Sequence, residues 1–176
     1  MDSRPVPAKY LTAGQEYLDA LVSLGLVPAF LGWGWDPATN QWLLVLVTSI
    51  VDAGGPLALN KLLFRAYIAK ATPKLISPFI VRIFSPEIVE NAGGRDFWLL
   101  GEKQLTVQGV LGKVKDPRSL QPTKVENIQK TFMGLELEMI NSYQTQPGAV
   151  DRALAGYHER HRQWQKFKRN VERLAA

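Results

Sequence analysis

The side chains best suited to metal or acid–base chemistry are two histidines near the C-terminus. His158-Glu159-Arg160-His161 resembles the His-Glu-x-x-His motif of zinc proteases but is one residue short. A spacing of three still places both imidazoles on one helical face, yet arginines flank them and the sequence suggests no third ligand. We interpret the segment as surface histidines on a basic helix and expect no metal site.

Other catalytic motifs are missing from the sequence. It contains no Gly-x-Ser-x-Gly nucleophile elbow and no phosphate loop, and Gly32-Trp33-Gly34 lacks the third glycine of a dinucleotide loop. The absence of cysteine excludes disulfides, thiolate metal sites and cysteine nucleophiles. The sequence therefore favours a non-catalytic protein without a cofactor or an identified small-molecule ligand. A small enzyme whose scattered carboxylates converge in the fold is the third hypothesis.

The charge of the chain is concentrated at one end. Residues 1–151 hold 14 basic and 14 acidic residues, whereas residues 152–176 hold seven basic and two acidic ones. The whole net charge of +5 therefore lies in the last 25 residues. Within them, Arg162, Lys166, Arg169 and Arg173 follow three-and-four spacing, which predicts a cationic row along one face of a helix.

The same segment carries an apolar stripe on the opposite face, interrupted once by a histidine. Its members are Val150, Leu154, Tyr157, His161, Trp164, Phe167, Val171 and Leu174. Three interpretations follow from this pattern. The helix packs on its own domain and leaves a solvated basic face, or its cations contact nucleic-acid phosphates, or it docks onto a partner or an acidic membrane surface.

Three tryptophans lie on the two sides of one expected turn. Trp33 and Trp35 precede Asp36-Pro37-Ala38-Thr39-Asn40, and Trp42 follows it. Period-two geometry puts Trp33 and Trp35 on one face and brings Trp42 almost opposite Trp35. The simpler interpretation is a cross-strand aromatic pair that stabilises a hairpin. The alternative is an aromatic binding surface made of the three tryptophans.

Hydrophobic periodicity and turn residues predict the elements that must position these groups. In chain order we expect a helix capped by Thr12 and Gln15 and ended by Gly25, strands at 27–35 and 42–49, a helix from Pro56 to Pro73, a strand at 78–84, a short helix after Ser85, strands at 96–100 and 104–110, a linker at 116–122, a helix over 124–143 and a last helix at 149–174. The segment 42–49 is apolar on both faces, which indicates a central strand. Residues 135–139 also alternate like a strand, so the helix over 124–143 has a strand alternative.

These elements predict a single α+β domain with a mostly antiparallel sheet of four to five strands. Residues 1–116 would form the α+β body with an N-terminal arm and helix. Residues 117–176 would form a C-terminal helical pair, with the basic last helix packed on the same domain. No stretch approaches the ~20 apolar residues of a membrane-spanning helix, and the N-terminus lacks the pattern of a secretory signal, so we expect a cytoplasmic protein.

Taken together, these features predict a binding or adaptor protein that acts through a macromolecular partner, either another protein or a second copy of itself. The alternative is a nucleic-acid-associated protein that contacts phosphates through Arg162, Lys166, Arg169 and Arg173.

Overall fold

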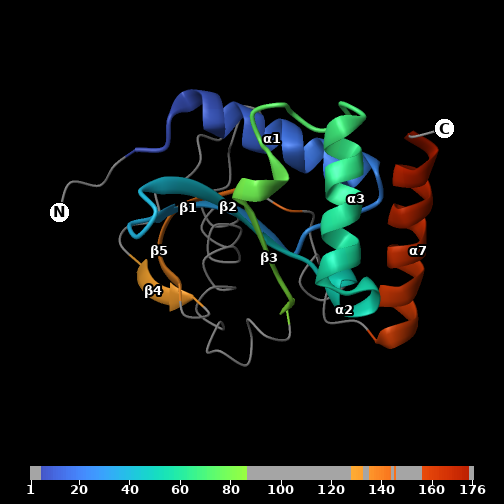
Figure 1. Ribbon diagram of the computed structural model, residues 1–176. Coiled ribbons are helices and arrows are strands. Elements are labelled where there is room, and N and C mark those ends of the chain that lie inside the picture. Colours follow the sequence, from blue (N-terminus) through green and yellow to red (C-terminus); the bar gives the residue numbers. More distant parts are fainter. Residues whose placement is uncertain (1–4, 87–127, 133–134, 144, 146–155, 175–176) are drawn as a thin grey trace, which may run out of the picture.

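A mixed sheet with helices packed on it forms the framework of the protein, so the predicted α+β class is confirmed (Figure 1). The computed structural model describes residues 5–86, 128–132, 135–143, 145 and 156–174. Within them the sheet has five strands in the order β3-β2-β1-β5-β4. The strands are β1 Phe30–Asp36, β2 Gln41–Val47, β3 Val81–Phe84, β4 Ile128–Phe132 and β5 Leu135–Ser142.

The directions of the strands follow from the connections between them. The β1–β2, β1–β5 and β4–β5 pairs are antiparallel, and a tight turn joins β1 to β2. The β2–β3 pair is parallel, because the chain leaves β2 through the helices α2 (Ile50–Gly54) and α3 (Pro56–Ile68) before it returns as β3. Pro56 opens α3, as the sequence predicts. The sheet is therefore mixed rather than purely antiparallel.

The strand β2 is buried on both faces, and its predicted central position is confirmed. It lies between β1 and β3, and every residue from Trp42 to Val47 is buried. Leu44 and Leu46 face the helices and share a core cluster with Leu21 and Leu63. The alternate residues of β2 project to the opposite face and are buried as completely.

The first helix, α1 (Ala8–Ser23), begins earlier than the sequence suggests. Thr12 lies inside the helix, so the predicted capping box with Gln15 is wrong; the residue before the helix is Pro7, which forms no side-chain cap. The predicted end is correct. Gly25 adopts a φ of 93° and its N–H donates to the carbonyl of Val22 at 3.0 Å, which is the left-handed termination that glycine favours.

The helix predicted over residues 124–143 is not formed, and with it the predicted C-terminal helical pair is corrected. Residues 128–132 and 135–142 instead fold as β4 and β5, and β5 pairs with β1, so that Gly34 lies opposite Met139. The strand alternative for residues 135–139 is the correct one. Pairing with an existing strand outweighs a helical apolar pattern, because local propensity is a weak term.

Several other sequence predictions lie outside the described residues. They are the N-terminal arm before residue 5, the body of the short helix after Ser85, the strands at 96–100 and 104–110, the linker at 116–122 and the start of the last helix. Because two of the predicted strands lie there, and because β4 and β5 are not among the predicted strands, the predicted set of strands and the division at residue 116 stay predictions. Among the helices of the described segments, none has the length and apolarity needed to cross a membrane.

A half-buried tyrosine joins the sheet to α1. The Tyr143 hydroxyl accepts a hydrogen bond from Trp33 Nε1 at 2.8 Å and donates to the backbone carbonyl of Leu11 at 2.8 Å. Gly14 allows this contact, since a Cβ at that position would overlap the Tyr143 phenol. The indole of Trp33 is fully buried, and this bond satisfies its N–H.

This tyrosine makes the stability of the fold sensitive to alkaline pH. Burial raises the pKa of Tyr143 to about 12 from its ordinary value of 10, and burial also raises the pKa of Tyr17. The folded chain keeps protons that the unfolded chain releases above pH 10. Their contribution to stability is complete below pH 10 and is lost as pH rises through 12.

Replacing Tyr143 by phenylalanine tests this linkage. We expect Tyr143→Phe to cost about 1–3 kcal/mol at pH 7, because a buried indole N–H loses its acceptor, and to weaken the fall in stability above pH 10. Urea denaturation between pH 7 and 11 measures both effects. The control Tyr157→Phe, at an exposed position, should leave stability at pH 7 unchanged. An unchanged alkaline slope in Tyr143→Phe would contradict the assignment.

Candidate partner-binding surface on the C-terminal helix

The last helix, α7 (Tyr157–Leu174), lies beside α3 and packs on its own domain (Figure 1). Trp164, Phe167 and Val171 are buried in the core cluster that also contains residues of α1, α3 and the sheet. At the two ends of the helix, Tyr157 and Leu174 are exposed. The middle of the predicted apolar stripe is therefore occupied within the protein and cannot dock onto another molecule. Val150 and Leu154 of that stripe lie outside the described residues.

The contact between α7 and α2 depends on a glycine. Gly54 is the last residue of α2, and a Cβ built on it would overlap the indole of Trp164. Because Gly54 has no side chain, the indole of Trp164 can pack directly against the backbone of α2. Gly55 follows with a φ of 82°, which allows the chain to turn directly from α2 into α3.

Polar contacts fix the orientation of α7. Asn170 Nδ2 donates to the carbonyl oxygen of Leu24 at 2.9 Å, at the C-terminal end of α1. Arg160 Nη1 lies 3.7 Å from Asp52 Oδ2, and the same carboxylate oxygen accepts a hydrogen bond from Ser85 Oγ at 2.8 Å. The Arg160 and Asp52 side chains keep only 18% and 26% of their surface exposed. These contacts join α7 to α1, to α2 and to the end of β3.

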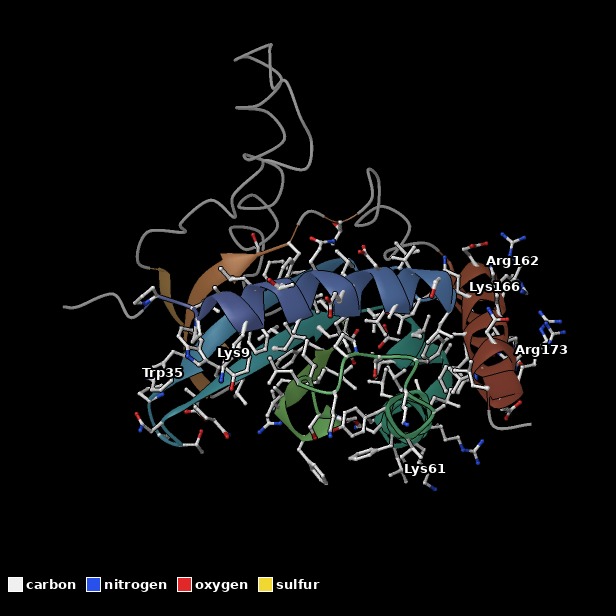
Figure 2. All side chains as sticks on the ribbon, turned by 90° about the horizontal axis from the view of Figure 1, so that it is seen from above. Lys9, Trp35, Lys61, Arg162, Lys166 and Arg173 are labelled. Carbon is white, nitrogen blue, oxygen red and sulfur yellow. The ribbon has the colours of Figure 1, made fainter. Side chains whose placement is uncertain are left out.

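The predicted cationic row faces solvent on the side of α7 opposite the buried stripe. Arg162, Lys166, Arg169 and Arg173 are all exposed, and Figure 2 shows Arg162, Lys166 and Arg173 pointing away from the body of the protein. Eleven residues separate the first and last members, so the row extends roughly 16 Å along the helix at ~1.5 Å per residue. The structure thus presents four cations in line on one rigid element.

Two acidic residues of α7 lie beside this row and neutralise it only in part. The carboxylate of Glu159 forms an ion pair with Arg162 and also accepts a hydrogen bond from Gln163 at 3.1 Å. Glu172 lies 4.0 Å from Arg65 of α3, with both side chains about half exposed. Exposed pairs of this kind contribute little free energy, so an incoming anion can replace the carboxylate beside Arg162.

The two histidines are exposed on α7. The ring of His161 stacks on Tyr157 with a centroid distance of 5.9 Å, and its Nε2 lies 3.4 Å from Gln165 Nε2. Among the described residues, no group of three or more His, Cys, Asp or Glu side chains is placed to hold a metal ion. His158 and His161 are therefore surface side chains in the described part of the structure.

The tryptophans of the hairpin form the expected cross-strand pair. Trp35 lies opposite Trp42 in the register, and their rings meet edge to face at a centroid distance of 5.1 Å. Trp33 and Trp42 are buried, whereas Trp35 is only half-buried. Two of the three rings thus belong to the core and expose little surface. A binding role for Trp35 stays a prediction.

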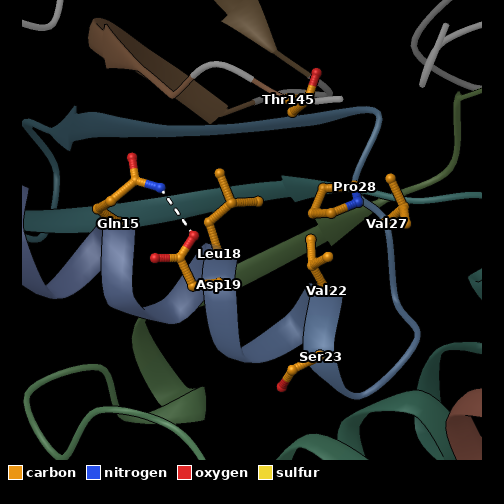
Figure 3. Close-up of a pocket in the computed structure, with 8 residues that line it drawn as sticks. All are labelled: Gln15, Leu18, Asp19, Val22, Ser23, Val27, Pro28 and Thr145. Carbon is orange, nitrogen blue, oxygen red and sulfur yellow. Dashed lines mark hydrogen bonds between the residues drawn. The ribbon is translucent and has the colours of Figure 1, made fainter. Parts of the chain in front are cut away.

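A hollow of about 320 Å³ lies where α1 meets the loop before β1 (Figure 3). Its lining comes from Gln15, Leu18, Asp19, Val22, Ser23, Val27, Pro28 and Thr145. The polar rim is already satisfied in part, because Gln15 Nε2 donates to Asp19 Oδ1 at 3.1 Å. The sequence does not reveal this hollow, because its shape depends on how α1 packs against the loop before β1 and on Thr145, which is distant in sequence from the other lining residues. The Ser23 hydroxyl in this lining donates to the backbone carbonyl of Ala20 at 2.8 Å and not to the carboxylate of Asp19, so α7 is the stronger candidate surface.

Comparison with known proteins adds no family to this description. No protein-family model matches the chain, and no curated protein or solved structure matches it significantly.

The Gly54–Trp164 contact can be tested by adding one methyl group. An alanine in a helix normally gains about 1 kcal/mol over glycine, but here the overlap with the indole dominates. We expect Gly54→Ala to lower the free energy of unfolding by about 1–3 kcal/mol, measured by chemical denaturation. Gly156→Ala is the control, since a Cβ there meets no atom within 4 Å. Higher stability in Gly54→Ala would contradict the proposed contact.

The bond between Asn170 and Leu24 gives a second test of how α7 is held. We expect Asn170→Ala to cost about 1 kcal/mol of stability and to speed amide hydrogen exchange in α7. Gln165→Ala on the same helix, at an exposed position, should change neither quantity. Equal effects of the two substitutions would show that this side chain does not anchor the helix.

Proposed function

We propose that the protein is a non-catalytic binding protein that acts through a macromolecular partner, and that the row Arg162, Lys166, Arg169 and Arg173 contacts the phosphates of a nucleic acid. One observation carries the proposal: α7 buries the middle of its apolar stripe, Trp164, Phe167 and Val171, in its own domain and turns the four cations to solvent. The contact that remains available on this face of α7 is therefore mainly electrostatic. Electrostatic contact with phosphates supplies most of sequence-independent nucleic-acid binding.

The rigidity of the row supports this partner. Trp164, Phe167 and the Asn170 bond hold α7 in place, so the cations need little reordering to meet a charged strand. One strand of duplex DNA carries a phosphate about every 3.4 Å of helix axis. A row of roughly 16 Å therefore runs alongside about five phosphates of one strand.

The described part of α7 presents mostly positive charge to such a partner. It contains Arg160, Arg162, Lys166, Lys168, Arg169 and Arg173 against Glu159 and Glu172. Neither carboxylate interrupts the row, and each already has a basic partner. A docking protein or a second copy of the chain would have to supply an acidic surface to match the same row.

Salt dependence gives the direct test. With four phosphate contacts, the logarithmic slope of affinity against salt is about −3.6, which is on the order of a 100-fold loss between 50 and 200 mM salt. Fluorescence anisotropy with a labelled 20-base-pair DNA and a single-stranded RNA measures it. Replacing Arg162, Lys166, Arg169 and Arg173 by glutamine should remove most of the binding and flatten the slope.

Two further variants sharpen the test. Glutamine at Lys9, Lys61, Lys70 and Lys74 removes the same net charge from exposed positions outside α7 and should leave most of the affinity intact. Glu159→Gln releases Arg162 from its ion pair and should tighten binding severalfold. Equal losses from both sets of four substitutions, or no binding at 50 mM salt, would overturn the nucleic-acid proposal. A dimer in light scattering would then favour contact between two copies.

A further inference from the structure

The helix α3 is apolar on two opposite faces. Leu59, Leu62, Leu63 and Ala66 form its buried face in the core. On the opposite side, a spacing of four, three and four aligns Leu57, Lys61, Phe64 and Ile68. Leu57 is 69% and Ile68 75% exposed. The outward face of a helix in a globular domain is normally polar, so this second face points to a further surface contact.

A rigid turn extends this surface beyond the helix. The 3₁₀ turn η1 (Pro78–Ile80) presents Phe79, which is 74% exposed and meets the Phe64 ring edge to face at 4.9 Å. Ser77 Oγ accepts a hydrogen bond from the N–H of Phe79, and Arg82 Nη1 donates to its carbonyl at 2.8 Å. The exposed ring is thus held in place. Leu75, which is also exposed, lies in the loop between α3 and this turn.

The charges within this segment of the chain are of one sign, although Glu172 of α7 lies 4.0 Å from Arg65. Residues 53–86 contain Lys61, Arg65, Lys70, Lys74 and Arg82 and no aspartate or glutamate. Figure 2 shows Lys61 on a different side of the molecule from Arg162, Lys166 and Arg173 of α7. We use the name α3 patch for Leu57, Phe64, Ile68, Leu75 and Phe79 with the surrounding cations Lys61, Arg65, Lys70 and Lys74.

We propose that the α3 patch docks on a membrane surface that contains anionic lipids. Leu57, Ile68 and Phe79 keep most of their surface exposed, so they project from a helix and a turn and do not line a groove of the kind that recognises a peptide helix. Leucine, isoleucine and phenylalanine that project in this way enter the boundary between headgroups and acyl chains. The surrounding lysines and arginine keep their charges at the level of the anionic headgroups. In this arrangement the α3 patch lies in the membrane interface, and none of the helices in the described segments spans the bilayer.

The absence of cysteine from the chain allows a specific reporter. An environment-sensitive dye on Ile68→Cys should shift to shorter wavelength with vesicles of 30% phosphatidylserine in phosphatidylcholine, and much less with phosphatidylcholine alone. The same dye on Ala38→Cys, at the exposed hairpin turn, should not respond. No spectral change at residue 68, or an equal change at residue 38, would overturn the proposal.

Vesicle sedimentation separates the apolar and charged contributions. We expect Ile68→Gln and Phe79→Gln each to weaken binding on the order of tenfold, and glutamine at Lys61, Arg65, Lys70 and Lys74 to weaken it about fivefold per cation. Glutamine at the four positions of the α7 row removes the same charge and should have a smaller effect. Wild-type binding by the apolar variants, or equal loss from the two charge sets, would overturn the proposal.

An acidic protein partner is the competing occupant. If a glutamate-rich amphipathic peptide, rather than anionic vesicles, shields the dye at residue 68 from an aqueous quencher, the surface is a protein-docking site and the membrane proposal fails. The nucleic-acid proposal rests on other residues and is unaffected by that outcome.

Discussion

The burial of β2 on both faces is the constraint on which the rest of the structure depends. A strand with apolar side chains on both sides must lie inside the sheet, so β1 and β3 flank it. The parallel partner requires a crossover, which the chain makes through α2 and α3. Those helices then bury their apolar stripes on the face that holds Leu44 and Leu46. The helices α2 and α3, on which α7 packs, therefore lie where they do because β2 must be shielded from water on both faces.

The position of the last helix follows from small features of that crossover. The short α2 ends at Gly54, whose missing side chain admits the Trp164 ring, and its Asp52 meets Arg160. Together with the Asn170 bond to α1, these contacts fix the rotation of α7 about its own axis. The side that turns inward is apolar, so the cations are directed outward. The exposed row is thus a consequence of packing rather than of any contact among the cations themselves.

Elements with a clear local sequence pattern are predicted correctly. Prediction fails where the secondary structure depends on pairing with a strand that is distant in sequence. The two-sided apolarity of Trp42–Val47, the left-handed Gly25 and the Trp35–Trp42 pair are each local signals, and each is confirmed. Residues 124–143 have helical spacing and residues 135–139 also alternate like a strand, and the pairing of β5 with β1, about a hundred residues earlier, favours the strand. The start of α1 at Ala8 has no capping side chain to mark it. For the candidate surface, spacing alone identifies the cationic row, but it does not reveal that Gly54 receives Trp164.

The two basic surfaces differ in the residues that lie between their cations, and this difference is the reason that we propose a different anion for each. On α7 the residues between the cations of the row are polar or face the core, so the row offers charge without exposed apolar area. On α3 the lysine and arginine are interleaved with protruding Leu57 and Ile68. Contact with a hydrated phosphate backbone buries little apolar surface, so exposed apolar groups add little to its affinity. A lipid interface does bury such groups, and their burial is favourable. Apolar content therefore distinguishes the two surfaces better than net charge, because each carries four cations within a short stretch of one α+β domain.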